Sequence, residues 1–236
     1  MSQVTRPNRT GLPGKQGMYD PALEHDACGF GFIANIHNQP SHEIVNQALQ
    51  IVVNMDHRGA VGADPLAGDG AGILIQTPDK FMRKEFAAQG IEVPAMGDYA
   101  VGMVFLPRDQ KVRDAGIDAI NRVTMAEGQI VLGWRDVPVD NSVLGESVKP
   151  NEPVIKQVLI ARGPNTPDTD AFDRKLYVIR KQSHHLIWDA DDTAWQNFYM
   201  PSLSSRTIVY KGLVLAGNLA KYYLDFQTPE FETAMA

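Results

Sequence analysis

Cys28 is the single cysteine of this chain and its best candidate for a nucleophile. A lone cysteine is more often a small buried hydrophobe than a reactive thiol, but glycines at positions 29 and 31 would leave this thiol accessible. A polar leader of 27 residues precedes it, so cleavage between Ala27 and Cys28 would place the thiol on the chain terminus. A free α-amino group titrates near ~7.7–8.0 and can accept the thiol proton directly or through one water. Cys28 could then act without a histidine base.

A glycine-rich stretch over residues 56–72 carries the other candidate groups. Arg58 could bind main-chain carbonyls or a carboxylate, or it could be a surface arginine at a helix end. Asp64 and Asp69 could suggest a phosphate or metal loop, but no Lys-Ser or Lys-Thr pair follows Gly72, so the phosphate-loop pattern fails. Aspartates in turns more often hydrogen-bond the local backbone. The clustered glycines indicate that the backbone turns sharply or closely approaches another segment.

Other possible metal ligands are sparse. His184 and His185 are neighbours near the end of an expected helix, and adjacent helical positions do not share a face. We therefore expect no metal site.

Composition restricts the class of protein. The chain is 44% hydrophobic and 21% charged, which suits a globular protein with a sizeable core. A net charge of −6 and a pI near 5.5 argue against a nucleic-acid surface. No apolar run approaches the ~20 residues of a membrane-spanning helix, and the leader has no apolar centre of the kind found in secretory signals. One cysteine allows no internal disulfide, so we expect a protein of a reducing compartment, the cytoplasm, without membrane association.

Apolar periodicity predicts strands that alternate with helices. The strands are expected at 28–34, 73–76, 98–106, 129–137, 153–161, 198–203 and 207–211, with the last two paired around a turn at 204–206. The helices are expected at 43–55, 79–88, 108–127, from 166 onward and at 217–223, and residues 229–236 resemble a helix that is just beginning. Ser41 should cap the first helix. The buried stripe of the long helix should be Phe172, Leu176, Ile179 and Leu186. The fold class is α/β (α+β) with sandwiched layers.

Four segments together resemble one known family. The sequences CGFGFIAN (28–35) and NMDHRGAVGADPLAGDGAGILIQTP (54–78) resemble the start of the large subunit of glutamate synthases. The sequences RKLYVIRK (174–181) and SLSSRTIVYKG (202–212) resemble the same family in the same order. The resemblance runs from about residue 20 onward. It implies a leader over 1–27, followed over 28–236 by the N-terminal part of a class II glutamine amidotransferase domain. The fold that it implies is an incomplete four-layer αββα sandwich of the N-terminal-nucleophile hydrolase type.

The same resemblance implies a reaction. In that family the leader is removed, and the exposed cysteine attacks the side-chain amide of L-glutamine to form a thioester and release ammonia. Carried over residue by residue, Cys28 matches the nucleophile, the Ala27–Cys28 bond matches the cleavage point, and Arg58 matches the arginine that orders the loop around the nucleophile. In complete enzymes the ammonia reaches a barrel domain and combines there with 2-oxoglutarate.

The resemblance also implies cofactors and partners outside this sequence. FMN and an iron–sulfur cluster are expected in the full-length family member, and none in this chain. The partners would be the remainder of the large subunit and an electron-donating small subunit or ferredoxin.

The sequence departs from the family in one respect. Members continue past a FETAMA-like segment into a His-Ser-Arg-Phe-type stretch, whose arginine holds the substrate carboxylate, and then an Asn-Gly pair that supplies the oxyanion hole. Neither occurs in this sequence, and the loss of one oxyanion donor costs ~2.7–4 kcal/mol of transition-state stabilisation. We therefore expect a fragment that is inactive alone. The alternative is a non-catalytic remnant or interaction module that needs a completing chain.

Overall fold

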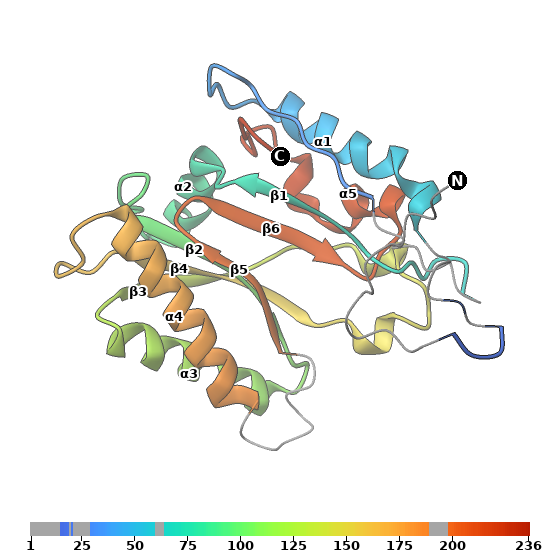
Figure 1. Ribbon diagram of the computed structural model, residues 1–236. Helices are drawn as coiled ribbons and strands as arrows, with labels where there is room; N and C mark the ends of the chain where they lie inside the picture. The colour runs from blue at the N-terminus through green and yellow to red at the C-terminus, as the bar shows by residue number, and fades with distance from the viewer. Residues whose placement is uncertain (1–14, 19, 21–28, 60–63, 189–197) are drawn as a thin grey trace, which may run out of the picture.

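Two antiparallel sheets form the centre of the molecule (Figure 1). The computed structural model describes residues 15–18, 20, 29–59, 64–188 and 198–236. The smaller sheet pairs β1 (Ala71–Gln76) with β6 (Thr207–Gly212). The larger sheet has the strand order β3 (Ile130–Asp136), β4 (Val154–Ala161), β2 (Tyr99–Leu106) and β5 (Tyr199–Ser204). The mixed helix and sheet content confirms the predicted α/β class.

Helices flank the two sheets. They are α1 (His42–Asn54), α2 (Asp79–Ala87), α3 (Gln110–Ala126), α4 (Thr169–Trp188) and the short α5 (Leu219–Tyr222). In Figure 1, α3 and α4 lie along the larger sheet, and α1 lies beside the smaller sheet on the opposite side of the molecule. The expected cap of α1 is confirmed, because the Ser41 hydroxyl accepts a hydrogen bond from the Ile44 amide at 3.4 Å. No helix in the described part of the chain is long and apolar enough to cross a bilayer.

Two apolar clusters hold these layers together. One joins the larger sheet to α3 and α4 and includes Val104 and Leu176. The other joins both sheets to α1 and α2 and includes Val45, Met103 and Tyr210. Successive side chains of a strand point to opposite faces. β2 therefore contributes Val104 to the cluster with α3 and α4 and Met103 to the cluster between the two sheets. This two-sided burial explains the unbroken apolar run by which the sequence predicts β2.

The predicted pairing of the last two strands is wrong. β5 pairs with β2, and β6 pairs with β1, so the chain crosses from the larger sheet to the smaller one between them. The corner is fixed by α4, because the main-chain N–H and the hydroxyl of Ser205 both donate to an Asp173 carboxylate oxygen, at 3.0 and 2.9 Å. This anchor turns the chain out of the plane of the larger sheet.

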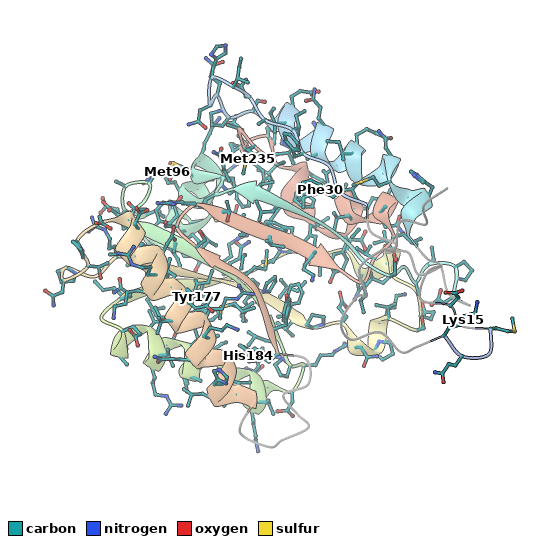
Figure 2. All side chains as sticks on the ribbon, viewed as in Figure 1. Lys15, Phe30, Met96, Tyr177, His184 and Met235 are labelled. Atoms are coloured by element: carbon teal, nitrogen blue, oxygen red, sulfur yellow. The ribbon has the colours of Figure 1, made fainter. Side chains whose placement is uncertain are left out.

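Two further predictions need correction at residues 29–34 and 229–236. Neither segment forms the expected strand or helix; instead they run antiparallel to each other with isolated bridges, Ala34 opposite Met235 and Ser41 opposite Thr233. The Ile33 amide donates to the Ala236 carbonyl at 2.8 Å, and the Ala236 amide donates back to Ile33 at 2.9 Å. Backbone groups used in this way are not available for helical i→i−4 bonds. In Figure 2 the labelled Phe30 and Met235 both lie beside α1.

The buried stripe of α4 also differs at one position. Phe172, Leu176 and Ile179 are fully buried as predicted, but Leu186 is 58% exposed. The stripe continues instead through Ile187, which is 2% exposed. Leu186 therefore lies just outside the arc of the helix that packs on the sheet.

Candidate active site

The predicted catalytic groups fall at the margin of the described structure. Ala27 and Cys28 lie outside the described residues, and so does the side chain of Arg58. The backbone of Arg58 ends a 3-10 turn, Asp56–Arg58, directly after α1. The roles of these three residues therefore stay predictions, and the described surroundings supply the geometry.

A hollow of about 730 Å³ opens beside Gly29, the residue that follows Cys28. Besides Gly29, its described wall is formed by residues 52–59 at the end of α1, residues 68–74 of the glycine loop and β1, the ends of β2 and β5, and residues 209–216 from β6 onward. Val52 of α1 faces this space and is only half-buried, although the helical stripe places it on the apolar face. The hollow is thus assembled from segments that are distant in the sequence.

Three charged residues line the described wall of the hollow: Asp56, Asp69 and Lys211. The Lys211 ammonium lies 5.2 Å from the centroid of the Tyr199 ring, within the range of a cation–π contact. The Tyr199 ring lies 6.1 Å from the ring of Phe105. The Lys211 carbonyl accepts a hydrogen bond from the Tyr223 hydroxyl at 2.8 Å. This bond fixes the backbone at this end of β6. The wall combines acidic groups on the glycine loop side with one cation on the β6 side.

The expectation of close backbone approach in the glycine stretch is confirmed at Gly72. This residue lies opposite Lys211 in the β1–β6 ladder. A Cβ atom at position 72 would lie 2.8 Å from the Tyr210 carbonyl oxygen and 2.7 Å from the Lys211 Cβ. Only glycine lets the two strands pair at this point without displacement.

Gly72→Ala should therefore lower the free energy of unfolding by about 1–3 kcal/mol, the usual cost of overpacking. Equilibrium unfolding in urea measures this change. Gly217→Ala is the matched control, since a Cβ at position 217 would meet no atom within 4 Å. Equal effects of the two substitutions would contradict the steric explanation.

Asp64 acts on the backbone, which confirms its interpretation as a turn aspartate. One carboxylate oxygen accepts from the Leu66 amide at 3.0 Å. The other accepts from the hydroxyl of Ser147 at 2.6 Å and from its amide at 3.0 Å. The hydroxyl hydrogen bond, followed by the amide bonds, holds the pKa of Asp64 below its ordinary value, because these donors favour the charged form. The contact to Ser147 spans 83 residues and has no signal in the sequence.

A buried ionic network supports β6 from the side of the larger sheet. The guanidinium of Arg135 donates to both carboxylate oxygens of Asp225, at 2.6 and 2.9 Å, and to Gln157 at 2.7 Å. The Tyr210 hydroxyl donates to Asp225 at 2.8 Å and accepts from the Gln157 amide at 2.8 Å. The side chains of Arg135 and Asp225 are only 3% and 2% exposed. Glu85 also accepts from Arg135 at 3.1 Å. Sequence reasoning did not find this network, because 90 residues separate Arg135 from Asp225.

Burial and charge act in opposite directions on Arg135. Burial lowers the pKa of the Arg135 guanidinium, but the hydrogen bonds and charge of Asp225 outweigh it, so the net pKa lies above the ordinary value. Burial raises the pKa of the Tyr210 hydroxyl well above its ordinary value. Arg135 is therefore charged and Tyr210 neutral, and the network serves to position β6.

The described residues contain no group of three or more His, Cys, Asp or Glu side chains that could hold a metal ion. His184 and His185 lie near the end of α4, with their ring centroids 6.2 Å apart; His184 is labelled in Figure 2.

Known proteins resemble this chain along most of its length. The family model for class II glutamine amidotransferases matches residues 28–236. The large chain of the NADPH glutamate synthase of Bacillus subtilis (strain 168) is 43% identical over 225 residues, which cover 95% of this chain and 14% of that protein. The NADH glutamate synthase of Schizosaccharomyces pombe is 43% identical over 95% of this chain and 11% of its own length. The ferredoxin-dependent glutamate synthase 2 of Synechocystis is 39% identical over 90% of this chain and 13% of its own length. The chain thus spans only a small part of these relatives.

Proposed function

Since this chain belongs to the class II glutamine amidotransferases, we propose that it forms the front part of the glutaminase domain of a glutamate synthase, with Cys28 as the nucleophile that releases ammonia from L-glutamine. The observation that carries the proposal is where the family match begins. It starts at residue 28, which is the single cysteine of the chain. The hollow supports the proposal, because it is lined by Gly29, the residue that follows Cys28 in the sequence.

The proposed reaction follows from a cysteine at the start of the mature chain. After the bond between Ala27 and Cys28 is cut, the free α-amino group accepts the thiol proton. The thiolate attacks the side-chain carbonyl carbon of L-glutamine, and the C–N bond breaks as the α-ammonium returns its proton to the leaving ammonia. Water then adds to the thioester and breaks the C–S bond, which gives L-glutamate and regenerates the thiol. Arg58 orders the loop around the nucleophile.

The proposed domain also has a proposed fold. A four-layer αββα sandwich of the N-terminal-nucleophile hydrolase type is supported by two features. The two sheets share one apolar cluster, and α1 lies on the opposite side of the molecule from α3 and α4 (Figure 1). The further strands and the oxyanion and carboxylate-binding groups of the domain would come from sequence outside these 236 residues.

The rest of the proposed reaction lies outside this chain. Ammonia would pass to a synthase domain and combine with 2-oxoglutarate to give a second L-glutamate. A cluster of the four-cysteine type needs four thiolate ligands, and this chain has one cysteine, so the remainder of the large subunit would hold the iron–sulfur cluster and the FMN. A small subunit or ferredoxin would donate the electrons. We propose that the whole reaction takes place in the cytoplasm.

The proposal is tested on the native protein that contains this sequence. We expect it to release ammonia and L-glutamate from L-glutamine, and we expect mass spectrometry to find a mature chain that starts at Cys28. L-asparagine, which is shorter by one methylene, is the control substrate and should react far more slowly. A protein that keeps residues 1–27 and hydrolyses no glutamine would instead support the alternative of a non-catalytic interaction module.

A further inference from the structure

The loop that walls the hollow is tied to a distant turn by one carboxylate. One oxygen of Asp64 accepts two hydrogen bonds from Ser147, from its hydroxyl at 2.6 Å and from its amide at 3.0 Å. The other oxygen accepts from the Leu66 amide at 3.0 Å, and the Asp64 carbonyl accepts from the Ala67 amide at 3.0 Å. Asp64 therefore shapes its own loop and holds it to the turn at 145–149.

The partner turn is built to receive this carboxylate. A Cβ atom at Gly145 would lie 2.3 Å from an Asp64 carboxylate oxygen, so this close contact requires glycine. The Val148 and Lys149 amides donate to the Gly145 carbonyl at 3.0 and 3.2 Å, and these bonds close the turn. The neighbouring Leu144 is 3% exposed and fixes the turn to the apolar core.

The tied loop leads directly into the candidate site. Residues 68–70 follow Asp64 by a few positions and line the hollow beside Gly29. The partner turn contributes Ser147 to a second hollow of about 300 Å³, which shares Tyr199 and Lys211 with the first. The contact between Asp64 and Ser147 thus joins the walls of two adjoining spaces.

We propose that Asp64 is a positioning residue for glutamine hydrolysis, which acts through Ser147 to hold the 64–70 loop in place as a wall of the substrate hollow. The inference rests on the proposed function and adds to it a residue that touches neither the substrate nor the thiol. A loop that forms the wall affects the binding of substrate more than the reaction at the thiol. Loss of the contact should therefore raise KM for L-glutamine and leave kcat nearly unchanged.

The test compares Asp64→Ala, Ser147→Ala and the double variant in the native protein. Asp64→Ala should raise KM for L-glutamine about 3- to 10-fold, the range expected for loss of one or two partly exposed hydrogen bonds, with kcat within about 2-fold of wild type. Ser147→Ala keeps the main-chain donor and should have a smaller effect. The double variant should have the same KM as Asp64→Ala, because both substitutions act on the same contact. Ser147→Thr keeps both the hydroxyl and the main-chain donor, so its KM should equal that of wild type.

A second readout does not depend on activity. Hydrogen–deuterium exchange of a peptide covering residues 64–72 should be faster in Asp64→Ala than in wild type. Asp140→Ala is the matched control, since the Asp140 carboxylate accepts from the Ser142 amide at 2.9 Å within its own turn, and the main-chain bond from Asp140 to the Tyr222 carbonyl is kept in the variant. It should change neither KM nor exchange at 64–72.

Three outcomes are decisive for the inference. Unchanged KM and unchanged exchange in Asp64→Ala would overturn it, and so would additive effects of Asp64→Ala and Ser147→Ala. A KM that rises equally in Asp140→Ala would also overturn it. A wild-type protein without glutaminase activity would overturn the proposed function itself. The exchange rates would then test only whether the contact between Asp64 and Ser147 holds the loop in place.

Discussion

Cys28→Ala should abolish glutamine hydrolysis in the native protein, since alanine removes the sulfur atom proposed to form the thioester. The expected loss is to the background rate, because the covalent pathway has no other thiol in this chain. Without the thiol, the α-amino group has no thiol proton to accept as a general base. The measurement is release of ammonia from L-glutamine at saturating substrate.

One further variant and one labelling experiment distinguish the nucleophile from the residues around it. Arg58→Ala should weaken hydrolysis without abolishing it, since this residue is proposed to order the loop around the thiol. An electrophilic glutamine analogue should add its mass to the peptide that begins at Cys28 in wild type, and to no peptide of this chain in Cys28→Ala. Glutamine hydrolysis that survives Cys28→Ala would contradict the assignment of the nucleophile.

Asp225→Ala should destabilise the fold by about 3–5 kcal/mol, the usual cost of breaking a buried ion pair by removing one partner. The Arg135 side chain is 3% exposed, so its charge would stay buried without its bidentate acceptor. The Tyr210 hydroxyl would also lose the carboxylate to which it donates at 2.8 Å. Equilibrium unfolding in urea measures the loss.

The matched control for Asp225→Ala is a charge removed from an exposed pair. The Glu146 side chain is 88% exposed and pairs with Lys149 at 2.6 Å, and exposed pairs contribute about 0–1 kcal/mol. Glu146→Ala should therefore change the free energy of unfolding by less than about 1 kcal/mol. If Asp225→Ala lowers the free energy of unfolding by no more than the control does, the buried network does not stabilise the fold as proposed.

Elements with a strong local signal were predictable from the sequence. The helix α1 follows from the Ser41 cap and the apolar stripe, and β2 follows from an apolar run buried on both faces. Both signals arise within a few residues of the element itself. The assignment of Cys28 as the nucleophile rests on a single cysteine in a segment that resembles a known family, and it stays a prediction.

Pairings between distant residues were not predictable. Nothing near β5 or β6 indicates that each pairs with a different sheet, because the choice is made by β2, β1 and the Asp173 anchor. The bridges of Ala34 with Met235 and of Ser41 with Thr233 stand where the sequence predicted a strand and a helix, and the reason is the same. The contacts that support the site, Asp64 with Ser147 and Arg135 with Asp225, join residues 83 and 90 positions apart.

The hydrogen bonds between Ile33 and Ala236 have a consequence for the order of events during translation. The ribosome adds about 5–20 residues per second, so roughly 10–40 s separate the synthesis of these two residues at that rate. Until Ala236 has emerged, the segment that follows Cys28 lacks the backbone partner that holds it beside α1. A nascent chain therefore carries residues 33–35 without these backbone partners until residues 234–236 have been made.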